Sequence, residues 1–174
     1  MSVQIRPYRP EDRTAVVALT IAAFEGVSID HNLDRRLGGV AGRDWRWRKG
    51  RDVEQDIDRH DSELAVAEAE STGEVVGYVT MQFDHETRIG WIHNLAVEEA
   101  FRGHGLGRRL IEHALDRFRA AGMAVAKIET LEQNEVGRHL YPALGFREIA
   151  RQIHFAMTLD PAIAKPSEQG TAGT

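Results

Sequence analysis

Three glycines stand at alternate positions in the stretch FRGHGLG, directly before residues spaced for an amphipathic helix. Gly103, Gly105 and Gly107 allow the backbone to bend and to approach an oxygen atom closely, because glycine has no Cβ atom. The first N–H groups of a helix lack partners inside the helix, and the helix dipole adds partial positive charge there. Formal positive charge comes from Arg102 within the stretch and from Arg108 and Arg109 directly after it. The stretch therefore predicts an anion cradle that suits a pyrophosphate.

A plain helix-entry turn, with glycines present for steric reasons alone, is the structural alternative. Two familiar phosphate motifs do not match. A dinucleotide fingerprint needs GxGxxG, but this stretch has GxGxG, and Arg108 stands where the last glycine belongs. A P-loop needs GxxxxGK followed by serine or threonine, which the stretch lacks.

The elements that would position this turn can be predicted from the spacing of apolar residues. Alternation predicts strands, and a spacing of three and four predicts helices. The expected strands are 3–8, 63–70, 75–84, 87–97 and 123–130, with closing strand material over 145–159; the expected helices are 10–24, 106–118 and 134–144. Strand 123–130 should run parallel to strand 87–97, because a helix connects the two. Residues 25–60 show little periodicity and are expected to form short helices and loops.

Around the glycines the chain resembles a known family. RGHGLG, from Arg102 to Gly107, fills every fixed position of the pattern Q/R-x-x-G-x-G/A, and NEVGRHLYPALGF downstream fits N-x-x-x-x-x-x-Y ending in GF. Both motifs, in this order, resemble the acyl-CoA-binding signatures of the GCN5-related N-acetyltransferase (GNAT) superfamily. The resemblance covers residues 63–158 well and the first 24 residues more loosely, whereas residues 25–60 carry no signature.

The resemblance implies a mixed α/β fold: a twisted, mostly antiparallel sheet of six or seven strands, splayed between two central parallel strands and flanked by helices. It implies a single N-acetyltransferase domain over residues 1–160, in which 25–60 is the variable acceptor-side segment. Residues 161–174 are small and polar, which is typical of a disordered tail. The implied function is transfer of an acetyl group from acetyl-CoA to a primary amine. Two alternatives are a non-catalytic acyl-CoA-binding regulatory module and an unrelated nucleotide-binding protein.

The resemblance also assigns roles to residues. Cofactor binding falls to a strand end (Leu95, Ala96, Val97), to the glycine turn (Arg102, Gly103, His104, Gly105, Leu106, Gly107, with Arg108), and to Asn134 and Tyr141. Tyr141 would also be the general acid for the leaving thiolate. A helix N-cap is the structural alternative for Asn134, and a packed aromatic for Tyr141. Acetyl or a longer acyl group would fit these assignments equally.

An ammonium acceptor must lose a proton before its nitrogen can attack a carbonyl, so a general base is expected. Glu129 is the first candidate for the base. Its E-x-x-x-x-N spacing to Asn134 resembles that of ribosomal-protein and N-terminal acetyltransferases, and burial at a sheet opening would raise its pKa. The structural alternative for Glu129 is an ion pair with an arginine. His93 comes second, four residues before Val97 as in arylalkylamine acetyltransferases. Strand alternation would place His93 with Leu95 and Val97 on one face.

Composition excludes other classes of function. With a formal net charge of −5 the chain has no global attraction to nucleic acid or anionic membranes. It has no cysteine, so disulfides and cysteine nucleophiles are excluded, and its histidines lack the spacing of a metal site. The first residues have no apolar core of signal-peptide length, which favours the cytoplasm. An amine acceptor is the expected partner, with a homodimer left open.

Two further clusters are interpreted as structural. GRDWRWRKGRD interleaves basic residues with Trp45 and Trp47, which are expected to anchor the variable segment over the acceptor cleft rather than to stack on nucleic acid. DIDRHD, residues 56–61, is expected to be a solvated face.

Overall fold

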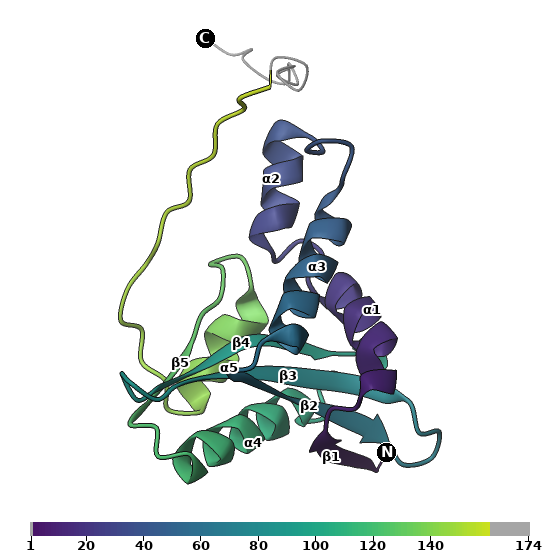
Figure 1. The fold of residues 1–174 in the computed structure, drawn as a ribbon, viewed down its shortest axis with the longest axis vertical. Coiled ribbons are helices and arrows are strands. Elements are labelled where there is room, and N and C mark those ends of the chain that lie inside the picture. Colours follow the sequence, from purple (N-terminus) through teal and green to yellow (C-terminus); the bar gives the residue numbers. More distant parts are fainter. Residues whose placement is uncertain (1, 161–174) are drawn as a thin grey trace.

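A computed structural model describes residues 2–160 (Figure 1). The strands are β1 (Val3–Pro7), β2 (Ser62–Ala69), β3 (Val75–Asp84), β4 (Ile89–Val97) and β5 (Val125–Ile128). The helices are α1 (Arg13–Ala23), α2 (Ile29–Leu37), α3 (Trp45–Asp58), α4 (Leu106–Ala120) and α5 (Glu135–Ala143), with short 3-10 turns at Pro10–Asp12 and Glu99–Phe101. The order of elements confirms the prediction up to the end of α5.

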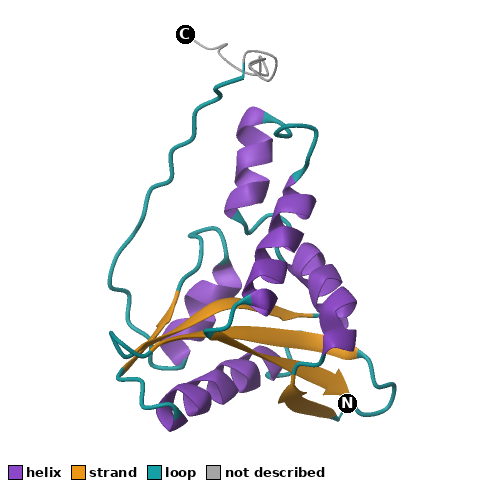
Figure 2. Cartoon of the chain, viewed as in Figure 1, coloured by secondary structure: helices purple, strands orange, loops and turns teal. Residues whose placement is uncertain are grey.

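The strands form one sheet in the order β1-β2-β3-β4-β5. Neighbouring strands are antiparallel except β4 and β5, which are parallel as predicted because α4 connects them. Helices cover both faces of the sheet (Figure 2). The helix α4 packs on one face, around Leu110 and Ile111, and α1 and α3 pack on the other, around Val16 and Val53. The mixed α/β class is therefore confirmed.

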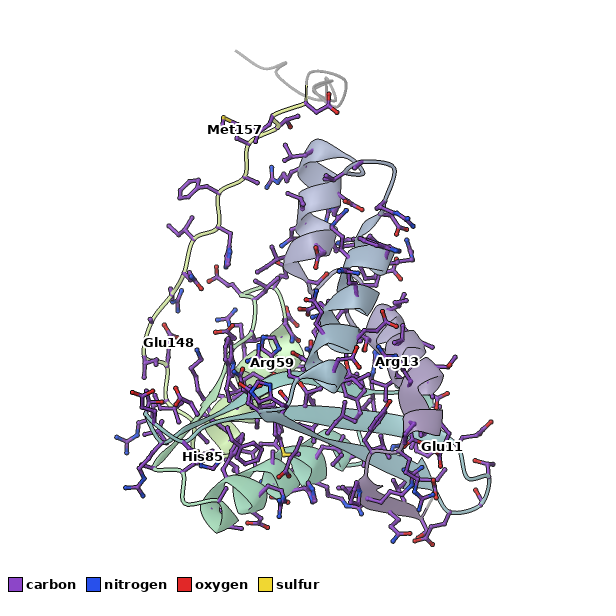
Figure 3. All side chains as sticks on the ribbon, viewed as in Figure 1. Glu11, Arg13, Arg59, His85, Glu148 and Met157 are labelled. Atoms are coloured by element: carbon purple, nitrogen blue, oxygen red, sulfur yellow. The ribbon has the colours of Figure 1, made fainter. Side chains whose placement is uncertain are left out.

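The number of strands was predicted wrongly. The described residues contain five strands rather than six or seven, and residues 145–160 contain none. The segment 147–160 leaves the sheet region as an extended chain (Figure 1), and Met157 points away from the rest of the molecule (Figure 3). Consequently β5 is an edge strand within the described residues, whereas a central position was expected.

Residues 149–159 keep the alternating pattern that suggested a strand. Their apolar members are exposed, including Ile149 at 88% and Phe155 at 92%. Alternation shows that one face of a segment is apolar, but a strand also needs a neighbouring backbone with which to exchange hydrogen bonds. The sequence supplied the first condition and could not supply the second. The expected tail, 161–174, lies outside the described residues.

The variable segment forms two helices. Ser28 caps α2, since its Oγ accepts a hydrogen bond from the His31 N–H at 3.1 Å, and Asp44 caps α3 in the same way through the Trp47 N–H at 3.1 Å. Trp45 is buried and anchors α3 as expected. Trp47, in contrast, is exposed.

A β-bulge interrupts the pairing of β3 with β4. Val79 lies opposite Leu95 and Met81 lies opposite Ile92, so one residue of β3 faces two residues of β4, His93 and Asn94. Beyond this bulge the alternation of side chains shifts by one position. This local irregularity decides where the side chains of β4 point.

Candidate functional site

The glycine turn joins the end of β4 to the start of α4. Gly103 and Gly105 have φ angles of +78° and +79°, a left-handed conformation that glycine adopts without strain. Gly105 is the N-cap of α4 and has no side chain that could accept a hydrogen bond from the first turn. An added Cβ at Gly103 or Gly105 would meet no atom of the protein within 4 Å, so the space beside the turn is open. These features fit the predicted pyrophosphate cradle.

The three arginines of this region have different roles. Arg102 donates from Nε to the Val97 carbonyl oxygen at 3.0 Å and so fixes the turn to the end of β4. Arg108 lies between α4 and α5, where Nη2 is 3.5 Å from the Ala143 carbonyl oxygen. Arg109 donates to the Val3 carbonyl oxygen at 2.7 Å and is thus directed to β1. Two of the three guanidinium groups therefore remain near the turn and the α4–α5 side.

The parallel strands separate just before the turn. β4 and β5 pair only over Ile89–Ile92 and Val125–Ile128, and no strand of the described chain pairs with β4 on that side after Ile92. Leu95, Ala96 and Val97 remain paired with β3 on the other side. Backbone groups of this strand end that face the open side could pair with an extended ligand, except the Val97 carbonyl oxygen, which already accepts from Arg102 Nε.

Asn134 is the N-cap of α5, which confirms the structural alternative for this residue. Its Oδ1 accepts from the Gly137 N–H at 3.3 Å, and its Nδ2 donates to Thr130 Oγ1 at 2.9 Å. Asn134 therefore organises the start of α5, the helix that carries Tyr141.

Tyr141 is partly buried against the core cluster on the α4 side of the sheet. Its ring lies 6.2 Å from that of Phe146. Burial raises the pKa of the Tyr141 phenol, and a hydrogen bond with Thr130 opposes this shift. The phenol therefore holds its proton at neutral pH, as a general acid requires.

His93 lies on the opposite face from the one that simple alternation predicted. Because of the bulge, Leu95 and Val97 pack against the α4-side core, while His93 and Asn94 turn toward α3. The expectation that His93 shares a face with Leu95 and Val97 is wrong for this reason. The side chain of His93 is 28% exposed.

The imidazole of His93 is held by Asp56 at the end of α3. His93 Nδ1 lies 2.8 and 2.7 Å from the two carboxyl oxygens of Asp56. The hydrogen bond with Asp56 raises the pKa of His93, and burial of the ring opposes the rise. His93 also lies edge-on to Trp91, with ring centroids 4.6 Å apart.

Asp56 was assigned to a solvated face, and this assignment is wrong. Asp56 is only 5% exposed. The buried residues of α3 include Trp45, Lys49, Val53 and Asp56, which follow each other at steps of four, four and three. This is the spacing of one helix face, so the signal was present in the sequence but was obscured by the charged members. Sequence reasoning also missed Lys49 and Asn94, both buried.

Glu129 follows β5 and does not show the expected burial. Its side chain is 62% exposed, and its carboxyl oxygen lies 4.0 Å from Lys127 Nζ. The partner is thus a lysine rather than the arginine that was considered. The ammonium of Lys127 also stacks on Trp91, 3.7 Å from the ring centroid.

The structure groups the candidate residues on two sides of the sheet. Tyr141 packs with the α4-side cluster, whereas His93 and its partner Asp56 lie on the α3 side. The candidate acid Tyr141 and the candidate base His93 thus lie on opposite faces of the sheet. Among residues 2–160, no group of three or more His, Cys, Asp or Glu side chains could hold a metal ion, and no helix is long and apolar enough to cross a membrane.

Comparison with known proteins agrees with this architecture. The profile of the acetyltransferase (GNAT) family matches residues 31–146. N-alpha-acetyltransferase 30 of Saccharomyces cerevisiae is 29% identical over 83 residues, which are 46% of this chain and 47% of that protein. The ribosomal protein bS18-alanine N-acetyltransferase of Escherichia coli is 33% identical over 69 residues, 40% of this chain and 47% of that protein. The chain therefore spans about half the length of these curated relatives.

Solved structures share the fold. The crystal structure of the ribosomal-protein-S18-alanine N-acetyltransferase from Escherichia coli aligns with a TM-score of 0.61 at 19% identity, over 86% of this chain and 80% of that one. An acetyltransferase of Trypanosoma brucei aligns with a TM-score of 0.61 at 20% identity, over 90% of this chain and 100% of that one. Identity at this level shows the fold alone. Because the family profile covers most of the described residues, this chain belongs to the acetyltransferase (GNAT) family.

Proposed function

We propose that this chain is an acetyl-CoA-dependent N-acetyltransferase that passes the acetyl group directly to a primary amine. The observation that carries the proposal is the junction of an open β4 edge with a glycine turn at the start of α4, in a chain of the GNAT family. An open strand edge suits an extended amide-containing arm, and the helix start suits the pyrophosphate to which such an arm is attached.

The donor would lie along the end of β4 and the glycine turn. Backbone groups of Leu95, Ala96 and Val97 would pair with the pantetheine arm, and the main-chain N–H groups from Arg102 to Gly107 would hold the pyrophosphate, with Arg108 adding charge. Asn134 would reach the arm only by exchanging one of its present hydrogen bonds. Acetyl-CoA bound there would supply an acetyl group activated as a thioester.

Three proton movements accompany the transfer. A base removes a proton from the acceptor ammonium, and the freed lone pair forms the C–N bond while the C–S bond breaks. Tyr141 would protonate the departing thiolate, because its raised pKa keeps the phenol protonated. The attacking nitrogen also loses a second proton to solvent, which leaves a neutral amide and a free thiol. One of the two protons lost by the nitrogen restores the phenol through solvent, and the other is released.

We propose His93 as the base, ahead of Glu129. His93 is partly buried, faces α3 of the segment that would cover the acceptor, and has a carboxyl partner that orients its ring. Glu129 is largely exposed and close to a lysine, so burial does not prepare it for this role. This order reverses the preference that sequence spacing gave.

For the acceptor, we propose only a chemical class, and the names of the relatives suggest it. Two relatives are named for the amine that they acetylate: an alanine of ribosomal protein bS18 in one, and an N-alpha amine in N-alpha-acetyltransferase 30. A peptide with a free N-terminal amine is therefore the first acceptor to test. A lysine side chain, a polyamine and small metabolites with a primary amine complete the panel.

Release of free thiol from acetyl-CoA tests the proposal. The protein should release thiol in the presence of at least one amine of the panel, and mass spectrometry should find the acceptor about 42 Da heavier, because an acetyl group replaces one hydrogen of the amine. The same peptide with a blocked N-terminus is the matched control and should remain unmodified. Tight acetyl-CoA binding without thiol release for any amine would favour the non-catalytic acyl-CoA-binding module instead.

A homodimer and a cytoplasmic location belong to the same proposal. The exposed apolar row at 149–159 and the outer edge of β5, which has no strand partner within residues 2–160 and where Val125 is 56% exposed, favour a second copy as the partner. Light scattering should then give the mass of a dimer. The double variant Ile153→Asp with Phe155→Asp should give a monomer, whereas Gln152→Asp with His154→Asp, on the other face of the row, should remain dimeric. A monomeric unmodified protein would contradict the homodimer.

A further inference from the structure

The carboxyl group of Asp56, on α3, is buried next to the bulge between β3 and β4. A charged group is rarely buried in this way unless it has partners or a role. Asp56 is 5% exposed, and three residues of the sheet contact its oxygens. Asn94 donates from Nδ2 at 2.6 Å, and Thr80 Oγ1 lies at 3.3 Å. His93 Nδ1 is the third contact and belongs to a side chain that reaches solvent.

The other partners of this cluster fix Asp56 in place. Lys49 Nζ donates to Asn94 Oδ1 at 2.7 Å, which orients the Asn94 amide so that its N–H₂ faces Asp56. The Asn94 backbone N–H donates to Thr80 Oγ1 at 2.8 Å, so the Thr80 hydroxyl acts as a donor elsewhere, and Asp56 Oδ2 at 3.3 Å is nearer to it than the Asn94 carbonyl oxygen at 3.5 Å. Asn94 and Thr80 thus each present a donor to the Asp56 carboxyl group. The His93 ring is its third contact.

From this arrangement we infer that Asp56 is a positioning residue that holds His93 as the Nδ1–H tautomer and leaves the Nε2 lone pair to face the acceptor. A carboxyl group that already accepts from Asn94 and Thr80 favours a further donor, and the His93 ring can supply one only if Nδ1 carries the hydrogen. The inference rests on the proposed function for its catalytic meaning, because Nε2 is the atom that would take the proton of the amine.

The charges around His93 agree with this role. On α3, Asp56 and Asp52 raise its pKa and Lys49 lowers it, with the hydrogen bond to Asp56 as the largest effect. From β4, Trp91 presents its ring, and the Lys127 ammonium of β5 lies 3.7 Å from the centroid of that ring. When Nε2 gains a proton, the imidazolium charge lies beside the Asp56 carboxyl group, which stabilises it.

Nitrogen NMR of the unmodified protein, without donor or acceptor, tests the tautomer directly. Above the pKa of His93, Nδ1 should carry the hydrogen and Nε2 should show the shift of an unprotonated nitrogen. In Asp56→Asn the pKa of His93 should fall, because the largest contribution that raises it is removed. Asp61→Asn is the matched control, since Asp61 contacts Arg59 and Gln82 instead, and it should leave the His93 titration unchanged.

Kinetics of the same variants test the catalytic part. Asp56→Asn should lower kcat by about 10- to 10³-fold, change KM for the amine little, and move the acidic limb of the pH profile to lower pH. An Nε2–H tautomer in the unmodified protein overturns the inference even if Asp56→Asn fails to fold. If the Nδ1–H tautomer is observed but no amine is acetylated, the proposed function fails while the positioning of His93 by Asp56 remains.

Discussion

At the scale of single residues, the proposed chemistry depends on a phenol that keeps its proton. Tyr141 is partly buried and its pKa is raised by that burial. Tyr141→Phe removes the hydroxyl group and keeps the ring that packs near Phe146, so acetyl-CoA affinity should change little. We expect kcat to fall by about 10- to 10⁴-fold, the usual effect of a positioned proton donor. Single-turnover kinetics should be measured so that chemistry is the observed step.

Tyr8→Phe is the matched control for this variant, because it removes the same atom from a residue that packs in the cluster on the α1 and α3 side. It should leave kcat unchanged. A Tyr141→Phe enzyme with an unchanged chemical step would contradict the role of the phenol as acid.

Also at the residue scale, two side chains compete for the role of base. If His93 is the base, His93→Gln should lower kcat/KM and remove the acidic limb of its pH profile, while Glu129→Gln should keep both. The limb should lie above the pH expected for a free imidazole, because Asp56 raises the pKa of His93. Steady-state rates from pH 5 to 9 measure this. The opposite pattern would assign the base to Glu129, and an unchanged limb in both variants would exclude both residues.

At the scale of elements, the junction of β4 with α4 should determine donor binding. Gly105 has φ +79° and caps α4, so valine at this position is strained and places a side chain in the space proposed for phosphate. We expect Gly105→Val to weaken acetyl-CoA binding at least ~10-fold in calorimetry. Gly73→Val is the matched control, because Gly73 has φ +72° in the β2–β3 turn and equally open surroundings.

The control separates strain from obstruction of the site. Both variants should lose similar stability, since each forces a branched residue into a left-handed conformation. Only Gly105→Val should also lose affinity. Equal affinity for acetyl-CoA in the two folded variants would remove the turn from the donor site.

At the scale of the whole molecule, one buried ion cluster joins the first strand, the first helix and the second strand. Arg6 of β1 bonds both oxygens of Asp12 before α1, at 2.7 and 2.9 Å, and also bonds Glu68 of β2. The hydrogen bond from Arg6 lowers the pKa of Asp12. A lowered folded-state pKa stabilises the protein above the unfolded-state pKa, and this stability is lost as the pH falls through the folded-state value.

Asp12→Asn should therefore destabilise the protein by about 1–3 kcal/mol at pH 7, because Arg6 stays buried with one partner fewer. The difference from the unmodified protein should shrink as the pH falls below ~4. Urea unfolding at several pH values measures both effects. Asp58→Asn, which removes one acid from the exposed pair with Arg13, should change stability little. A pH-independent deficit in Asp12→Asn would contradict the assigned cause.

Much of the fold was predictable because its signals are local. The apolar spacing of α4, the alternation of β2 and β3 and the turn between them depend on nearby residues, and the structure confirms them. The parallel pairing of β4 with β5 also followed from the sequence, since a connecting helix leaves little alternative. The glycine turn was predictable because Gly103 and Gly105 occupy positions whose positive φ favours glycine.

The tertiary structure alone decided which distant groups meet. No local pattern announced the bulge opposite Thr80, yet this one extra residue turns His93 toward α3 and gives it Asp56 as a partner. Likewise the alternation of 149–159 could not show whether a neighbouring strand edge is within reach, and this segment pairs with no strand of the part of the chain that the structure describes. Local sequence determines the conformation and the apolar face of a segment, whereas its partners depend on how the whole backbone folds, because these contacts join residues far apart in the chain.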